Sequence, residues 1–308
     1  MPKLSIIIPF NNGRKYLDRC LKNITQIDFI DYEIILIDDF AKDNSEEIAR
    51  NYQNTKYYYT KEETIGVGNA RNLGVERAQG KYIIFLDVDD TINVKLMQNL
   101  EEYMNNDIDM IKYKMKIMHN DKKIYSKGPT FVKTDGEDAF NKLCFKDNLL
   151  DSPCVYLIKK ELFERTNLKF EKNVYHEDFG LIPLLIANAK SVVSTDVYIY
   201  NYYQSENSIM RNKDYSKKLK RVNDKFFLYD KLKQRIKKMS LKNNTKHNLL
   251  EYYTNSILMS VKELKYKDRV YFENIIREKG LINNIRAKNI IKKMILKHNI
   301  ELYFMIKF

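Results

Sequence analysis

The chain has 308 residues, 44% of them hydrophobic, and carries 54 Lys and Arg against 41 Asp and Glu, a net charge of +13. This composition predicts an ordered globular protein and excludes a disordered chain. Cys20, Cys144 and Cys154 form neither a disulfide framework nor a zinc-binding spacing, so a reducing cytoplasm is expected. No secretory signal and no run of about 18 apolar residues is found, which predicts no membrane-spanning helix.

The positive charge is confined to the last third of the chain. Residues 1–210 carry 28 Lys and Arg against 32 Asp and Glu, a balance of −4, whereas residues 211–308 carry 26 against 9, a balance of +17. A composition boundary is therefore predicted near Arg211. The basic region is expected to meet an anionic partner, for which membrane headgroups, nucleic acid and an acidic polymer are the candidates.

The first 90 residues alternate between apolar runs and amphipathic stretches. Strands are predicted at 4–10, 32–37, 56–60 and 81–86, and helices at 14–27, 43–52 and 66–79. The second strand ends in Asp38 and Asp39. Such alternation predicts a parallel sheet with right-handed crossovers and helices on both faces.

The fourth strand ends in three carboxylates, Asp87, Asp89 and Asp90. An open α/β sheet binds its ligands at the carboxyl ends of its strands, and clustered carboxylates repel one another unless a cation lies between them. Oxygen ligands of this kind favour Mg²⁺ or Mn²⁺. The structural alternative is that these residues and Thr91 cap a helix, which the motif alone fits equally well.

The glycines of the third helix do not form a dinucleotide fingerprint, because Arg71 stands where a third glycine would be required. Flexible glycines at a helix N-terminus, with Arg71 one turn inside, can instead meet a phosphate. An ordinary solvated arginine is the alternative.

After Asp90 the alternation stops, and residues 91–210 are predicted to add a mixed sheet. Helices are expected at 93–105, 135–143, 159–165 and 181–189, and strands at 108–118, 125–132, 152–158 and 191–200. Glu177 and Asp178 precede the last of these helices. They either cap it or supply a general base whose pKa is raised in a crevice, and His176 is a second candidate base or metal ligand.

Residues 211–308 are predicted to be basic and helical, with segments at 215–240, 248–265 and 289–308. Basic helices with large apolar faces are typical of segments that lie in a membrane interface. The alternative is that the apolar faces pack on the rest of the protein.

Four separated motifs, SIIIPFNN, EIILIDDFAKDNSEEI, GVGNARNLGVERAQGKYIIFLDVDD and YHEDFGLIP, resemble in order and spacing the bacterial family 2 glycosyltransferases with a GT-A fold. The resemblance covers roughly residues 3–210. It implies a Rossmann-like α/β fold, with a mixed, mostly parallel sheet and helices on both faces, followed by the basic helical region. The expected domains are a catalytic domain over 1–210, with a nucleotide-binding half (1–90) and an acceptor-binding half (91–210), and the region 211–308.

The resemblance also implies roles for individual residues. Asp39 would accept a hydrogen bond from uracil, Asp87 would contact the ribose, and Asp89 would hold the metal that bridges the diphosphate. Asp178 would be the catalytic base. The remaining donor-site residues are Pro9 and Phe10 beside the base and Arg71 at the nucleotide, and the secondary candidates are Asp38, Asp90, His176 and Glu177.

The resulting hypothesis is an inverting transferase, dependent on Mn²⁺ or Mg²⁺, that moves a sugar from a nucleotide sugar, expected to be a UDP-sugar, to a hydroxyl of a cell-surface glycan precursor. A glycan or lipid-linked acceptor of capsule, lipooligosaccharide or teichoic acid synthesis is expected, with the basic tail on the cytoplasmic membrane surface and no nucleic acid partner. The alternatives are a nucleotidyltransferase and a basic nucleic-acid-binding protein. The sugar, the linkage and a homo-oligomeric state are left open.

Overall fold

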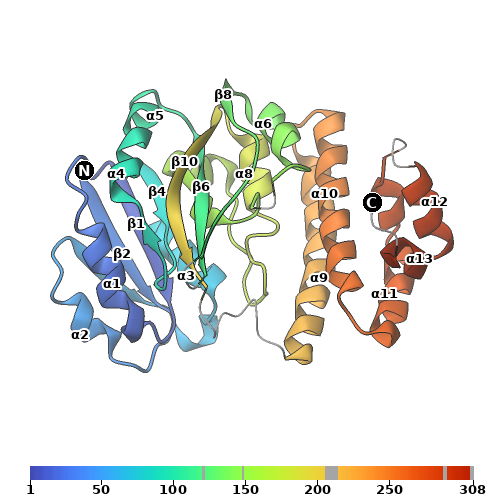
Figure 1. Ribbon diagram of the computed structural model, residues 1–308, viewed down its shortest axis with the longest axis horizontal. Coiled ribbons are helices and arrows are strands. Elements are labelled where there is room, and N and C mark those ends of the chain that lie inside the picture. The colour runs from blue at the N-terminus through green and yellow to red at the C-terminus, as the bar shows by residue number, and fades with distance from the viewer. Residues whose placement is uncertain (120–121, 148, 205–213, 287–289, 306–308) are drawn as a thin grey trace. The chain divides into compact units, whose positions relative to one another are not determined.

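The structure is a computed structural model that describes residues 1–119, 122–147, 149–204, 214–286 and 290–305 (Figure 1). The chain divides into two compact units, Met1–Asn212 and Lys213–Phe308. Arg211, at the predicted composition boundary, lies outside the described residues, as do the last three residues of the final predicted helix.

A mixed ten-stranded sheet forms the centre of the first unit. Every residue of the inner strands β1 (Leu4–Phe10) and β4 (Tyr82–Phe85) is buried, because helices cover both faces of the sheet. This burial explains why the sequence has unbroken apolar runs there. The first half of the sheet is parallel and consists, in spatial order, of β3 (Thr55–Tyr59), β2 (Tyr32–Asp38), β1 (Leu4–Phe10) and β4 (Tyr82–Phe85).

The strand order of this half reverses at β1, because the chain places β2 and β3 on one side of β1 and β4 on the other. The connections α1 (Arg14–Ile24) and α2 (Ser45–Ala49) lead from β1 to β2 and on to β3, and α3 (Val67–Arg77) returns to β4 on the other side of β1. Because the chain crosses in opposite directions, right-handed crossovers place α3 on the face opposite α1 and α2. The carboxyl ends of β1 and β4 therefore flank the reversal point, where α/β sheets bind ligands.

The second half of the sheet continues from β4 through β9 (Tyr156–Lys159), β6 (Met110–His119), β10 (Val192–Tyr203) and β5 (Thr91–Ile92). The short strand β9 is antiparallel to both neighbours, whereas β6 and β10 are parallel. The single strand predicted at 125–132 is wrong: β7 (Lys122–Tyr125) pairs with β6, and β8 (Phe131–Thr134) pairs with β10. Gly128 and Pro129 separate the two because they interrupt a strand.

The helix predicted over 93–105 is divided into three short pieces, α4 (Val94–Met97), a 3₁₀ turn (Gln98–Leu100) and α5 (Glu101–Asn105). The other helices of this half lie close to their predicted positions. They are α6 (Gly136–Leu143), α7 (Lys160–Thr166) and α8 (Ile182–Asn188), with further 3₁₀ turns at Glu62–Thr64 and Pro153–Val155.

The second unit is helical and has its own core. Phe226 stacks on Phe272 at 5.3 Å between ring centroids, and the buried ammonium of Lys225 donates to the hydroxyls of Ser256 and Ser260, both at 2.9 Å. Among its described residues no helix is long and apolar enough to cross a membrane. The helices are α9 (Tyr215–Lys238), α10 (Asn243–Lys262), α11 (Tyr266–Glu278), a 3₁₀ turn (Leu281–Asn284), α12 (Ile290–His298) and α13 (Ile300–Met305).

Gly80 should be intolerant of any side chain. A Cβ atom at this position would lie 2.6 Å from the Leu4 carbonyl carbon and from the Ser5 nitrogen, which are backbone atoms of β1. Since overpacking a core costs about 1 to 3 kcal/mol, Gly80→Ala should lower the free energy of unfolding by that amount in urea titrations. The exposed α3 substitution Glu76→Ala serves as the control and should leave the midpoint near that of the parent chain.

Candidate active site

The ends of β1 and β2 carry four of the predicted residues. Pro9 and Phe10 are buried, and the Phe10 ring packs edge-on against Tyr57 at 6.0 Å between centroids. Asp38 accepts from the Ala41 N–H at 2.6 Å and from the Tyr57 hydroxyl at 2.7 Å. One Asp38 oxygen therefore stabilises the turn after β2 and the other binds β3, which gives this secondary candidate a structural role.

Asp39 joins three strand-end segments. Its carboxylate accepts the Gly66 N–H at 2.8 and 3.0 Å and the Thr60 hydroxyl at 2.9 Å, and its own N–H donates to the Phe10 carbonyl at 2.7 Å. Gly66 begins α3 with φ +140°, a conformation that favours glycine. Asp39 is thus held at the end of β2 by the N-cap residue of α3.

Arg71 lies at the centre of the site. Its guanidinium donates to Glu177 with one nitrogen and to Asp87 Oδ1 at 3.1 Å with another, and its side chain is only 7% exposed. Burial acts to lower the pKa of Arg71, but the Glu177 and Asp87 charges outweigh it and raise that pKa above its usual value. The interpretation of Arg71 as a solvated helix residue is therefore wrong.

The three aspartates after β4 lie in different surroundings. Asp87 faces Arg71, and the backbone carbonyl of Asp89 accepts a hydrogen bond from Arg19. Asp90 is fully buried, where its oxygens accept from the Tyr200 hydroxyl at 2.6 Å and the Tyr203 N–H at 2.7 Å. Burial and the nearby Asp87 charge raise the pKa of Asp90 to about 8. Asp90 therefore attaches this turn to β10.

The capping interpretation of this motif is also wrong. Thr91 is not a helix cap, because it enters the short strand β5, which pairs with β10. The following helix α4 is capped two residues later by Asn93, whose side-chain oxygen accepts the Leu96 N–H at 3.2 Å.

Asp87 and Asp89 are the carboxylates that could contribute to a divalent cation site. Among the residues that the structure describes, no group of three or more His, Cys, Asp or Glu side chains forms a metal cluster. Mg²⁺ is commonly held by one or two carboxylates together with substrate phosphates. The donor set therefore fits a cation that binds with a diphosphate, and does not fit a site built from protein ligands alone.

The segment before α8 presents the remaining acids. Glu177 is buried in its ion pair with Arg71, whereas Asp178 is half-buried. Burial raises the pKa of Asp178 well above its usual value; the Glu177 and Asp151 charges add to the rise, and Arg71 opposes it. Neither acid caps α8, since its N-cap is Leu181 and no side chain provides a cap hydrogen bond there.

Several residues that contribute to this arrangement were missed in the sequence. Tyr200 donates to Asp90, the Arg19 guanidinium lies over the Tyr203 ring at 4.3 Å, and Asn72 binds the backbone of Phe170. No local sequence signal identifies these pairs, because each joins segments far apart in the chain. His176 has a positive φ of 60° and so shapes the turn before the acids.

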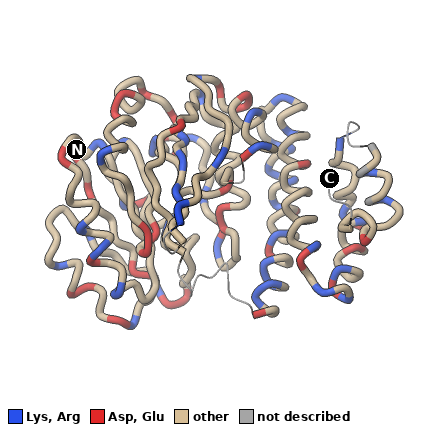
Figure 2. Tube along the Cα trace, in the orientation of Figure 1, with Lys and Arg blue, Asp and Glu red and all other residues tan. Residues whose placement is uncertain are grey.

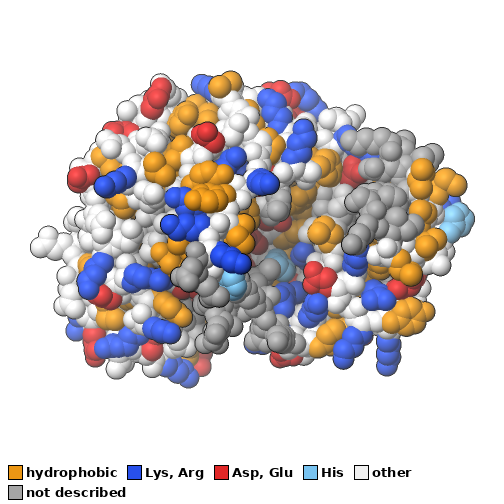
Figure 3. Space-filling model, in the orientation of Figure 1, with side chains coloured by type: hydrophobic (Ala, Val, Ile, Leu, Met, Phe, Trp, Pro, Cys, Tyr) orange, Lys and Arg blue, Asp and Glu red, His pale blue; other side chains and the backbone are white. Residues whose placement is uncertain are grey.

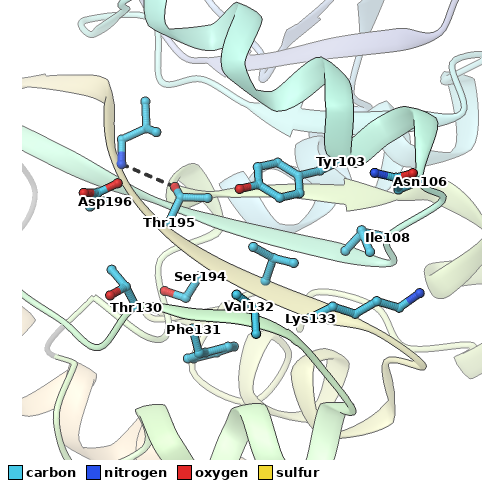
Figure 4. A pocket seen from close by; sticks show the side chains of 12 residues that line it. Tyr103, Asn106, Ile108, Thr130, Phe131, Val132, Lys133, Ser194, Thr195 and Asp196 are labelled. Atoms are coloured by element: carbon cyan, nitrogen blue, oxygen red, sulfur yellow. Dashed lines mark hydrogen bonds between the residues drawn. The ribbon is translucent and has the colours of Figure 1, made fainter.

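A separate groove of about 680 Å³ lies at the other end of β10 (Figure 4). Tyr103, Asn106 and Ile108 line it on one side, with Thr130–Lys133 of the β8 region and Val193–Val197 of β10. None of the strand-end acids lines this groove, so the groove and the acidic strand ends are different places on the first unit.

The fold and the acidic strand ends together define a glycosyltransferase with a GT-A fold. The model of the family described as Glycosyl transferase family 2 matches residues 5–166, more than half of the chain, and the chain belongs to this family. The crystal structure of Staphylococcus aureus TarS residues 1–349 with UDP-GlcNAc is similar to this chain, with a TM-score of 0.77 and 17% identity over 98% of this chain and 89% of that one. This likeness confirms the predicted fold.

Characterised and uncharacterised bacterial relatives extend the comparison. The glycosyltransferase EpsJ of Bacillus subtilis is 28% identical over 68% of this chain and 63% of its own length. The cholesterol galactosyltransferase of Borreliella burgdorferi is 30% identical over 67% and 62%. This chain therefore spans less than two thirds of these two relatives. The Staphylococcus aureus poly(ribitol-phosphate) β-N-acetylglucosaminyltransferase TarP is 26% identical over 89% of this chain and 87% of its own.

Tyr200→Phe should destabilise the first unit. The hydroxyl donates to the buried Asp90 and accepts the Asp87 N–H at 3.2 Å, so its removal leaves buried polar groups without a partner. Leaving a buried group unsatisfied costs about 1 to 3 kcal/mol, which denaturant unfolding can measure. Tyr125→Phe, at a half-exposed ring with no hydroxyl contact among those described, is the matched control; an equal loss in both variants would contradict the role of Tyr200.

Proposed function

We propose that this chain transfers a sugar from a UDP-sugar, with inversion and with the help of Mn²⁺ or Mg²⁺, to a hydroxyl of a cell-surface glycan precursor. The observation that carries the proposal is that one helix, α3, connects Asp39, Asp87 and the segment before Asp178. Residues expected to bind a nucleotide thus belong to one hydrogen-bonded assembly with Glu177, the neighbour of the expected base Asp178.

The donor half of the proposal assigns the nucleotide to the carboxyl ends of β1, β2 and β4. Asp39 would accept from the uracil N–H, Asp87 would bind the ribose, and Arg71 would contribute positive charge next to the diphosphate. A divalent cation held by Asp89 would neutralise charge on the leaving nucleoside diphosphate. Pro9 and Phe10 would form the wall beside the base.

Asp178 is the proposed general base. It would remove the proton of the acceptor hydroxyl while that oxygen attacks the anomeric carbon from the side opposite the leaving group, so that a single displacement inverts the configuration. A raised pKa suits this task, because a carboxylate with a higher pKa is a stronger base. The half-buried position of Asp178 leaves it accessible to an acceptor.

The proposed acceptor is supported by what similar proteins are named for. TarS and TarP of Staphylococcus aureus act on poly(ribitol-phosphate), and GgaB of Bacillus subtilis is a minor teichoic acid biosynthesis protein, 28% identical over 67% of this chain. A polymer or lipid-linked precursor of the bacterial envelope is therefore the acceptor class that we propose. A nucleotidyltransferase is disfavoured, because the β1 end has no Gly-rich loop with Lys or Arg for a triphosphate.

The proposed chemistry predicts different defects for Asp89 and Asp178. With a panel of UDP-, GDP- and CDP-sugars, the parent chain should release nucleoside diphosphate from one UDP-sugar, and EDTA should stop the release. Asp89→Ala should abolish that release by weakening metal-supported donor binding. Asp178→Asn should keep UDP affinity, measured by calorimetry, but lose about 10²- to 10⁴-fold in transfer rate, the usual contribution of a general base.

The exposed substitution Asp138→Asn on α6 is the control and should match the parent chain in both assays. Full transfer by Asp178→Asn would remove Asp178 from the mechanism. Donor release that survives both EDTA and Asp89→Ala would contradict the proposed role of the metal.

The second unit is the proposed membrane-contact region on the cytoplasmic side. The exposed face of α9 carries Lys231, Lys233, Lys237 and Lys238, and Figure 2 shows Lys and Arg along this helix. Apolar side chains are exposed among basic ones on the later helices, as Figure 3 shows for one face. The most exposed of these apolar residues are Met259, Tyr266, Tyr271, Ile291, Met294 and Met305. Basic charge beside exposed apolar groups favours an anionic lipid surface over nucleic acid.

Reversal of charge on α9 should release the chain from membranes. Each Lys near an anionic surface contributes about 1 kcal/mol, so changing Lys231, Lys233, Lys237 and Lys238 to Glu should lower binding to phosphatidylglycerol vesicles by more than 100-fold in sedimentation at low salt. The same reversals at Lys95, Lys122, Lys123 and Lys133 of the first unit are the control. Binding of the parent chain to duplex DNA but not to vesicles would instead support the nucleic-acid alternative.

A further inference from the structure

Two neighbouring residues of α3 hold the loop formed by residues 170–178. The side-chain amide of Asn72 donates to the Phe170 carbonyl, and its oxygen accepts the Phe170 N–H, both at 2.9 Å. Arg71 contacts the other end of the loop through its ion pair with Glu177, and its guanidinium lies 5.6 Å from the Phe170 ring centroid. Both ends of the loop are therefore bound to α3.

The loop can approach this closely because α3 has a glycine facing it. A Cβ atom at Gly68 would lie 2.3 Å from the Glu171 carbonyl oxygen and 3.0 Å from Glu177 Cβ. Within the loop, the Glu171 N–H donates to the Glu177 carbonyl at 3.4 Å, which closes it on itself. These backbone contacts place Glu177, and with it the next residue, Asp178, at a fixed position relative to α3.

The Arg71–Glu177 pair is a buried, charged part of this attachment. Glu177 is 8% exposed and Arg71 is 7% exposed, and 106 residues separate them in the chain. A buried carboxylate without its partner is strongly unfavourable, so the pair opposes any movement of the loop away from α3. The second bond of Arg71, to Asp87, connects this attachment to the donor side of the crevice.

We propose that Glu177 is a positioning residue, whose ion pair with Arg71 fixes the Asp178 carboxylate relative to the donor site. The proposal rests on the function given above for Asp178. Glu177 itself contacts neither donor nor acceptor in this role. It acts through Arg71 and through the loop that it closes.

Glu177 also sets the charge environment of Asp178. Glu177 and Asp151 are charged groups that raise the pKa of Asp178, and Arg71 lowers it. Replacement of Glu177 by Gln removes a repulsion that raises the pKa of Asp178, so that pKa falls. Because a protonated base cannot accept a proton, the parent rate declines as pH drops through the pKa of Asp178, and in Glu177→Gln this decline moves to lower pH.

The experiment compares Glu177→Gln with Asn72→Ala and with the exposed α7 control Glu164→Gln. A misplaced base costs about 100-fold in rate, so kcat for transfer should fall by about that factor in both test variants. UDP Kd should stay close to that of the parent in Asn72→Ala, which leaves Arg71 and both of its carboxylate partners in place. The acid limb of the pH profile should move only in Glu177→Gln, because Asn72→Ala changes no charge. Amide hydrogen exchange over 170–178 should accelerate in both test variants and not in the control.

Hydrogen exchange makes the test independent of a known donor. If the parent chain releases no diphosphate from any sugar nucleotide, the proposed function fails, yet slow exchange over 170–178 that Glu177→Gln accelerates would still establish the attachment. Unchanged kcat and unchanged exchange in Glu177→Gln would overturn the positioning role. If Glu177→Gln does not fold, Asn72→Ala decides: parent-like kcat and exchange in that variant would also overturn it.

Discussion

The site depends on the ion pairs that the buried guanidinium of Arg71 forms with Glu177 and Asp87. Arg71 lies in α3, about one and a half turns after the Gly66 N–H that binds Asp39. Its guanidinium binds Asp87 and Glu177, two carboxylates from different halves of the first unit. Burying these charges is favourable only as a set, since removal of one member leaves another without compensation. Asp39, Asp87 and Glu177 are consequently all bound by residues at the start of or within a single helix, α3.

The strand framework could be predicted from the sequence because its physical cause is local. Strands buried on both faces must be apolar at every position, and this requirement produces the unbroken runs of β1, β2 and β4. The order of elements then follows from short right-handed connections. The prediction failed where local signals are weak. The stretch 93–105 has helical composition but breaks at Gln98, and the run 125–132 hides two strands with different partners.

The acidic residues themselves were also visible in the sequence, since carboxylates at strand ends are unusual enough to stand out. The separate roles of these acids could not be predicted from the sequence. Asp38 and Asp90 look equivalent to Asp39 and Asp89 in the sequence, yet Asp38 closes a turn and Asp90 binds Tyr200 and Tyr203 of β10. Only the fold shows which groups bind each of these carboxylates. The partner of Arg71 was similarly hidden by a separation of 106 residues.

The attachment of the 170–178 loop has a consequence for how this enzyme can change over time. Asn72 binds Phe170 through backbone atoms, and Gly68 meets the backbone oxygen of Glu171, so these contacts do not depend on the identity of the loop side chains. Exposed Lys172 can therefore be exchanged by mutation while the loop keeps its path. Mutations could in this way change the side chains that the loop presents to solvent, while Asp178 keeps its position.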